Sequence, residues 1–239
     1  MNESKFLKRS TNLELMDDLA CSGAVVEQTL RELEIINRTL GGNAITVQGV
    51  MSLIGGESQP ISIVDLGCGG GDMLLLLHRK FEKRKVQFTF KGIDANRHIV
   101  AYASRHCAHD PSVSFVAMDI LSNEFRQLNF DIALATLFFH HFTDDQLVHV
   151  LRNLNSQVKF GMVINDLHRH PLAYYSIKLL VKFFSKSAMV KYDAPLSVLR
   201  GFSKMELEEI LNRAGIENYT IKWKWAFRWQ VVVNKKLPH

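Results

Sequence analysis

A glycine-rich turn directly after an apolar run constrains the fold of this 239-residue chain more than any other feature. Residues 61–66 are typical of a buried strand, Gly67, Gly69 and Gly71 follow at alternate positions, and the apolar residues 73–77 open a helix. Glycines at this spacing let the backbone turn tightly and approach a ligand at the carboxyl end of a strand. The pattern therefore predicts a strand–turn–helix unit of an open α/β sheet, with a ligand at the turn.

Two acids beside the turn, Asp65 and Asp72, indicate which class of ligand the turn binds. A dinucleotide-binding turn has glycine or alanine at the sixth position counted from Gly67, and this chain has Asp72 there. A phosphate-binding loop is excluded because no Gly-Lys-Ser/Thr follows the glycines. Negative charge at the start of a helix suits an amino group or a sulfonium better than a phosphate.

The stretch Asp65-Leu-Gly-Cys-Gly-Gly-Gly-Asp72 resembles the first motif of the class I S-adenosylmethionine-dependent methyltransferases. Further strand-end signals follow in that family's order, within residues 60–233, at 90–94, 113–120, 130–136 and 161–166. The resemblance implies that S-adenosyl-L-methionine is the cofactor, with Asp94 on its ribose hydroxyls and Asp119 near its adenine amino group. The implied cofactor contacts lie at the ends of these strands: Asp65, Gly67, Cys68, Gly69, Gly71, Asp94, Ala95, Met118, Asp119, Ile120 and Thr136.

Strand-like and helix-like patterns alternate along the middle of the chain, which predicts a parallel sheet with right-handed crossovers. The expected strands are 61–66, 86–93, 113–118, 130–136 and 158–165, and the expected helices are 72–81, 95–109, 122–128 and 144–155. Two strand-like runs in 218–234 predict a final antiparallel hairpin. The resemblance implies an α/β, Rossmann-like, seven-stranded and mostly parallel sheet in the order 3-2-1-4-5-7-6, with N-terminal helices and a helical lid inserted after strand 5.

The flanking segments are predicted to be helical. Residues 1–57 form an N-terminal helical cap and residues 58–239 the methyltransferase core, with the lid inserted at about 167–201. In the cap, residues 1–10 are expected to be frayed, one helix ends at 41–43, and another starts with Asn43 as its N-cap and closes at Gly55-Gly56. The lid carries apolar and aromatic positions on one helical face. A capping box, Ser203 with Glu206, opens the helix that follows the lid, and Gly215 ends it.

The strongest candidates for acid–base chemistry follow the fifth strand, in Asn165-Asp-Leu-His-Arg-His170. Titratable groups and a guanidinium crowded at the carboxyl end of a strand are typical of functional sites. We predict His168 as general base and His170 as a second candidate, with Arg169 orienting an acidic or carbonyl-bearing acceptor. The alternative interpretation is a solvated loop that N-caps the following helix.

The loop after the fourth strand, Thr136-Leu-Phe-Phe-His-His-Phe142, is the second candidate region. Its apolar residues are expected to shape the acceptor pocket, and His140, a further catalytic candidate, or His141 either faces the acceptor or packs. No metal site is predicted, because catechol-type O-methyltransferases place a carboxylate at the end of the fourth strand, and here that position lies near Thr136 among apolar neighbours.

The predicted function is methyl transfer to a hydroxyl or ring carbon of a small, apolar aromatic acceptor. A sulfonium is already activated, so the protein supplies mainly alignment and, for some acceptors, proton removal. Residues 14–18, 34–38 and 165–170 further resemble a bacterial subgroup encoded beside type III polyketide synthases and the quinone-ring C-methyltransferases. That resemblance implies a polyketide phenol, a pyrone or a quinone-like acceptor, and a place in secondary metabolism.

Two alternatives stay open: an RNA or DNA methyltransferase, and a non-catalytic S-adenosylmethionine-binding protein. The net charge of +5 permits a nucleic-acid partner. However, the chain lacks both the Asn/Asp-Pro-Pro-Tyr/Phe motif after the fourth strand and a cysteine at the ends of strands four and five. A small aromatic or lipid-like acceptor is therefore the expected partner, and the chain is expected to be a monomer or homodimer.

The cellular location is predicted from what the sequence lacks. Cys21, Cys68 and Cys107 are scattered, no apolar run approaches the ~20 residues of a membrane span, and the N-terminus has no apolar signal core. These features predict a cytoplasmic protein without a membrane span.

Overall fold

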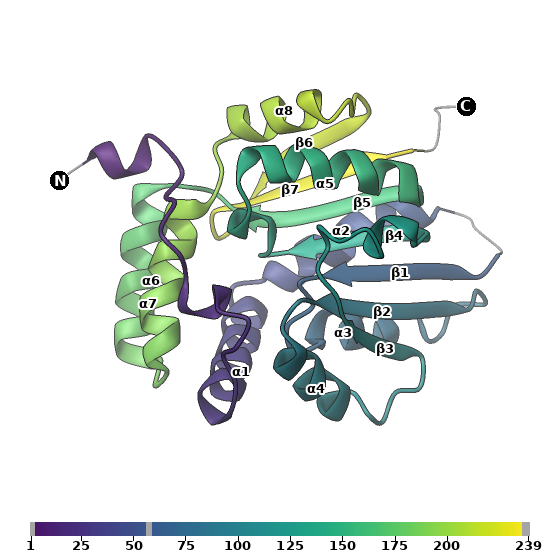
Figure 1. Ribbon diagram of the computed structural model, residues 1–239, viewed down its shortest axis with the longest axis horizontal. Coiled ribbons are helices and arrows are strands. Elements are labelled where there is room, and N and C mark those ends of the chain that lie inside the picture. The colour runs from purple at the N-terminus through teal and green to yellow at the C-terminus, as the bar shows by residue number, and fades with distance from the viewer. Residues whose placement is uncertain (1–2, 56–58, 236–239) are drawn as a thin grey trace.

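A seven-stranded sheet in the order β3-β2-β1-β4-β5-β7-β6 forms the centre of the molecule (Figure 1). The computed structural model describes residues 3–55 and 59–235. Strands β1 to β5 pair in parallel, and β7 runs antiparallel to both β5 and β6. The strands are β1 Ile61–Leu66, β2 Phe88–Asp94, β3 Val113–Ala117, β4 Phe130–Thr136, β5 Val158–Leu167, β6 Tyr219–Lys224 and β7 Arg228–Asn234. The predicted fold class and strand order are confirmed.

Helices cover both faces of the sheet, which explains why the central strands are apolar on both sides. On one face, α5 (Asp144–Gln157) and α8 (Lys204–Arg213) pack leucine and isoleucine side chains on β4, β5 and β7. On the other face, α2 (Gly42–Ile54) and α3 (Asp72–Phe81) pack on β1, β2 and β4. Helix α4 (Arg97–His106) lies against β2 and β3. The carboxyl ends of the parallel strands are left open toward the remaining helices.

Those remaining helices stand beyond the strand ends. Helix α1 (Ala24–Thr39) lies beside the pair α6 (Pro171–Phe184) and α7 (Ala188–Arg200), which is inserted after β5 (Figure 1). The N-terminal residues start at the 3-10 turn η1 (Glu3–Phe6), beside α6, and run along α7 to the 3-10 turn η2 (Leu15–Asp17). No helix in the described ranges is long and apolar enough to cross a membrane.

Most local predictions hold, because the stop and start signals act within a few residues. The Ser203–Glu206 capping box is present at the start of α8. Helix α2, however, starts at Gly42 with Gly41 as N-cap in the left-handed region at φ 74°, so the prediction that Asn43 is the N-cap is wrong. The helix expected over 122–128 is only the 3-10 turn η3 (Phe125–Gln127). Gly56 and the predicted 57/58 domain boundary lie outside the described residues.

The expectation that residues 1–10 are frayed is wrong for the described part of that segment. The guanidinium of Arg9 donates to the carbonyl oxygens of Arg200 at 2.9 Å and Phe142 at 2.8 Å, and it pairs with Asp144. Because these bonds satisfy the last carbonyl of α7 and the loop after β4, they tie the N-terminal segment across the open end of the sheet.

Candidate active site

One large cavity, of about 760 Å³, lies at the carboxyl ends of β1, β2 and β4. Its floor contains almost all of the residues predicted to contact the cofactor: Asp65, Gly67, Cys68, Gly69, Asp94, Ala95, Met118, Asp119, Ile120 and Thr136. Gly71 does not line it. Gly71 instead N-caps α3 at φ 80°, and a Cβ there would lie 2.6 Å from the Phe115 ring, so its role is structural.

The glycine turn brings the backbone to the cavity wall. Gly67 has φ 66°, and a Cβ on it would lie 2.1 Å from Cδ2 of Phe138. Gly69 has φ 50°, and the nearest atom to a Cβ there is a methyl carbon of Leu30 at 3.6 Å. The turn therefore packs against the β4 loop on one side and leaves room for a ligand on the other.

Three carboxyl groups lie beside the turn, and little positive charge lies near them to offset their own. Asp65 is buried, its Oδ1 has no hydrogen-bond partner, and burial together with the charges of Asp72 and Asp94 raises its pKa well above the usual range. Burial also raises the pKa of Asp94, although its carboxylate accepts from the backbone N–H of Asn96 at 3.0 Å. Burial and the charge of Glu34 raise the pKa of Asp72 to about 6. A cationic group bound here would relieve this cost.

A buried histidine–aspartate pair lies at the other side of the cavity. Nδ1 of His140 is 2.7 Å from Oδ1 of Asp166, and the His140 backbone N–H donates to Oδ2 at 3.2 Å. Burial alone would raise the pKa of Asp166, but the charge and hydrogen bond of His140 outweigh it and lower that pKa. Asp166 is therefore an acceptor-only carboxylate, which assigns the Nδ1 proton to His140 and leaves its Nε2 to face the cavity.

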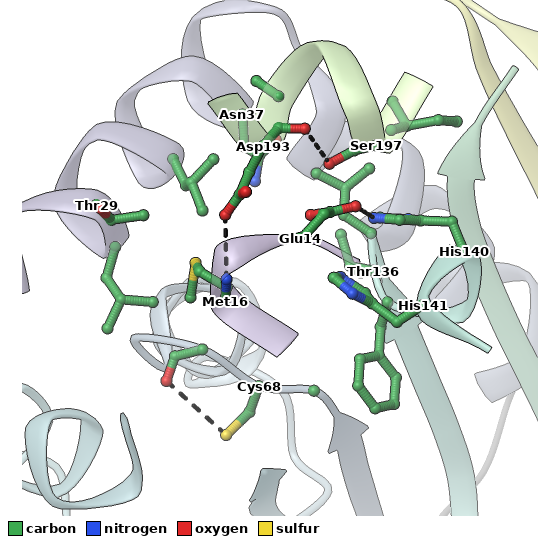
Figure 2. A pocket seen from close by; sticks show the side chains of 18 of the residues that line it. Glu14, Met16, Thr29, Asn37, Cys68, Thr136, His140, His141, Asp193 and Ser197 are labelled. Carbon is green, nitrogen blue, oxygen red and sulfur yellow. Dashed lines mark hydrogen bonds and ion pairs between the residues drawn. The ribbon is translucent and has the colours of Figure 1, made fainter. Parts of the chain in front are cut away.

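Glu14, on the N-terminal segment, faces that nitrogen. Its Oε1 is 3.6 Å from Nε2 of His140, the contact drawn as a dashed line in Figure 2. This distance is too long for a hydrogen bond, and no other hydrogen bond reaches this oxygen. Burial raises the pKa of Glu14 to about 7, against the opposing charges of His141 and Arg200. The turn is held in place because Asp193 accepts from the backbone N–H groups of Leu15 at 2.7 Å and Met16 at 3.2 Å.

A second pair, His141 with Asp17, lies beside the first. Nδ1 of His141 is 2.6 Å from Oδ1 of Asp17, and Nη1 of Arg200 is 2.5 Å from Oδ2. Burial would raise the pKa of Asp17, but these two hydrogen bonds lower it well below its usual range. The rings of His140 and His141 are 4.3 Å apart between centroids.

Glu14, His140 and His141, here called the histidine–glutamate cluster, each offer one ligand atom within 4.8 Å of the others. Within the described part of the chain, they are the group of this kind that can hold a metal ion. Arg200, with Nη1 3.8 Å from Oε1 of Glu14, already supplies a positive charge next to the carboxyl group. The predicted absence of a metal stays a prediction.

His168, Arg169 and His170 do not line the cavity, because the chain leaves the sheet after Leu167. Nδ1 of His168 accepts from the Trp223 indole at 3.3 Å. The guanidinium of Arg169 donates to Glu206 at 2.7 Å, and Nδ1 of His170 N-caps α6. The structure thus shows the capping that the alternative interpretation of this loop described, and the catalytic roles of His168, Arg169 and His170 stay predictions.

Sequence reasoning missed the residues that the N-terminal segment brings to the site, above all Glu14 and Asp17. Glu14 lies 126 positions before His140 in the sequence. Residues 14–18 stood out only through the family resemblance, which gave Glu14 and Asp17 no role, and acids in so short a segment are also typical of a solvated turn.

Comparisons with known proteins place the fold. The family model described as "Methyltransferase domain" matches residues 63–161. None of the curated proteins matches the sequence. The plantazolicin methyltransferase BpumL in complex with SAH is 17% identical with a TM-score of 0.63, over 89% of this chain and 100% of that one.

Two further solved structures are similar. Human N-acetylserotonin methyltransferase in complex with SAM is 15% identical with a TM-score of 0.62, over 89% of this chain and 56% of that one. The CMeT domain of the citrinin polyketide synthase is 14% identical with a TM-score of 0.57, over 75% of this chain and 47% of that one. Residues 63–161 therefore match the model of a methyltransferase domain, and the chain around them has the Rossmann-like methyltransferase fold of these solved structures.

Proposed function

We propose that this chain transfers the methyl group of S-adenosylmethionine to a hydroxyl or ring carbon of a small, apolar aromatic acceptor. One observation carries the proposal: a single cavity joins the acid-lined glycine turn to an apolar chamber that is lined by His140, whose imidazole is paired with the buried Asp166. Its volume of about 760 Å³ is in the range of ligand pockets, which is roughly 300–1,000 Å³.

The floor residues fit S-adenosylmethionine, which supplies an activated methyl group on a cationic sulfonium. Asp65 has a buried oxygen without a partner, as an amino-group ligand requires. Asp94 ends β2 and still has acceptor capacity for ribose hydroxyls. Asp119 also lines the floor, and the resemblance implies that it lies near the adenine. Gly69 lines the cavity, which lets the ligand reach the backbone of the turn.

The acceptor chamber is apolar and is closed by helices. Helices α1, α6 and α7 line it with Leu33, Ile177, Leu180, Val190 and Val198. Aromatic rings from the β4 loop complete the wall, and two of them, Phe138 and Phe142, meet edge to face at 5.1 Å between centroids. This lining favours a flat, apolar molecule. Two structural neighbours, an N-acetylserotonin methyltransferase and a polyketide synthase domain, also support a small-molecule acceptor.

His140 is the proposed general base. With Nδ1 hydrogen-bonded to Asp166, the neutral imidazole presents its Nε2 lone pair toward the chamber. Nε2 takes the proton that the acceptor hydroxyl or ring carbon loses, and the Asp166 carboxylate stabilises the imidazolium. The pKa of Glu14 is about 7, so its carboxyl group gains and loses a proton near neutral pH. It therefore shares this proton with Nε2 of His140 across the 3.6 Å gap.

The test is methyl uptake from labelled S-adenosylmethionine by a panel of phenols, pyrones and quinone precursors. We expect His140→Gln to lower turnover by roughly 10²–10⁴-fold, the usual contribution of a general base, with cofactor binding retained in calorimetry. His168→Ala is the matched control and is expected to keep wild-type turnover. Cofactor binding without methyl uptake by any acceptor would favour the non-catalytic alternative, and uptake by RNA would contradict the acceptor class.

A further inference from the structure

Helix α6 is apolar on two sides, which a helix that only closes a cavity does not require. Its inner side lines the cavity through Ala173, Ile177 and Leu180. Its outer side exposes large apolar side chains to solvent: Leu172 at 62%, Tyr175 at 40%, Leu179 at 59%, Phe183 at 68% and Phe184 at 82%. Clustered exposed side chains of this size mark an interaction surface.

The exposed residues form one stripe. Leu172, Tyr175, Leu179 and Phe183 are spaced by three, four and four positions, so they lie one above another on the same face of the helix. At 1.5 Å per residue the stripe is about 16 Å long. We call it the α6 outer stripe. A partner must therefore accept a narrow, elongated apolar ridge.

Basic residues accompany the α6 outer stripe. Lys178, Lys182 and Lys186 are all exposed, and Nζ of Lys182 lies 5.8 Å from the centroid of the Phe183 ring. Lys5, from the N-terminal segment, places its Nζ 3.7 Å from the centroid of the Tyr174 ring. Between residues 171 and 192 the sequence has four lysines and neither aspartate nor glutamate. The partner must therefore have an anionic outer layer, which the lysines contact, and an apolar layer beneath it, which the stripe contacts.

We propose that the α6 outer stripe docks on an anionic lipid membrane, with the apolar ridge at the acyl boundary and the lysines on the headgroups. An exposed apolar ridge flanked by lysines is the composition of helices that lie in a membrane interface. A second copy of this chain fits less well, because a two-fold contact through α6 would face its lysines with the same lysines. The membrane then lies one helix away from the acceptor chamber.

This arrangement gives an apolar acceptor a short route, from the lipid phase past α6 into the cavity. The route rests on the proposed function, whereas the docking does not. The two are tested separately, because vesicle binding is measured without an acceptor and turnover is measured with a water-soluble one.

The experiment is co-sedimentation of the full chain with two kinds of vesicle, one of phosphatidylcholine alone and one containing about 30 mol % phosphatidylglycerol. We expect salt-sensitive binding to the anionic vesicles. The double variant Leu179→Ser/Phe183→Ser is expected to lose at least about tenfold in partitioning because its apolar ridge is gone. Lys178→Gln/Lys182→Gln is expected to lose about 25-fold in partitioning on anionic vesicles only, at about fivefold per lysine.

Met205→Ser is the matched control, since Met205 is 78% exposed on α8 and lies outside the stripe. It is expected to bind vesicles as the wild type does. Wild-type protein that stays in the supernatant with anionic vesicles, or a Leu179→Ser/Phe183→Ser variant that binds as well as wild type, would overturn the proposal. A wild-type dimer that becomes monomeric in that variant, without vesicle binding, would assign the stripe to a second copy instead.

Discussion

Replacing Glu14 by glutamine is expected to make the protein more stable at high pH while impairing it as an enzyme. Glu14 is only 6% exposed, and its Oε1 has no hydrogen-bond partner. Burial raises its pKa from 4.5 to about 7, so folding opposes its ionisation. Glutamine has nearly the same shape and never ionises, so the variant escapes this cost.

The magnitude follows from the pKa difference between the folded and unfolded chains. The folded protein retains the Glu14 proton up to about pH 7, whereas the unfolded chain loses it near 4.5, so the free energy of unfolding falls as pH rises between these values. Since a tenfold change in proton affinity equals about 1.4 kcal/mol, the cost is about 1 kcal/mol at pH 5 and about 3 kcal/mol at pH 8. Relative to wild type, Glu14→Gln is therefore expected to gain about 2 kcal/mol between pH 5 and pH 8.

The assay is urea denaturation of wild type and Glu14→Gln at pH 5, 6, 7 and 8, without cofactor, supplemented by thermal melts. For a chain of this length the same difference corresponds to roughly 4–8 °C in melting temperature. Turnover is measured in parallel, and we expect it to fall because the carboxyl group that shares the His140 proton is lost.

A stability difference between Glu14→Gln and wild type that does not change from pH 5 to pH 8 would refute the reasoning, because the carboxyl group would then titrate normally. Asp17→Asn is a control of opposite sign. The pKa of Asp17 is lowered, so its carboxylate stabilises the fold above the unfolded value of 3.8 and loses this effect as pH falls. The asparagine variant is therefore expected to be less stable than wild type at pH 8.

Three further predictions concern the cofactor floor and the histidine–glutamate cluster. Asp94→Ala is expected to weaken S-adenosylmethionine binding at least about tenfold in calorimetry, with an unchanged circular dichroism spectrum; an equal Kd would remove Asp94 from the site. Gly67→Ala adds a Cβ 2.1 Å from Phe138 at φ 66°, so the unfolding free energy should fall by about 1–3 kcal/mol in urea titrations, and a fully stable variant would contradict the tight turn. Dialysis against a chelator is expected to leave turnover unchanged, whereas a loss that Zn²⁺ restores would make the cluster a metal centre.

Local patterns determined much of the fold. The glycine turn, the strand–helix alternation and the capping box at Ser203 each act over a few residues, so the sequence alone predicts where β1, α3 and α8 begin. The parallel sheet follows from that alternation, because parallel strands need a crossover between them. The positions of Asp65 and Asp94 follow as well, since both lie on strands whose carboxyl ends form the ligand edge of the sheet.

The arrangement of side chains around His140 was decided by tertiary structure. The sequence places both His168 and His140 after strand ends and favours His168 as the base. Only the fold shows that the chain turns outward after Leu167, so that His168 packs on the ring of Trp229 with centroids 4.9 Å apart. Glu14 reaches His140 because Arg9, far along the chain from its partners, anchors the N-terminal segment across the open end of the sheet. Periodicity reports which face of an element is buried, whereas contacts between distant segments depend on how those elements pack. The sequence by itself therefore placed Asp65 and Asp94 at one edge of the sheet, and only the tertiary structure brought His140, Asp166 and Glu14 together.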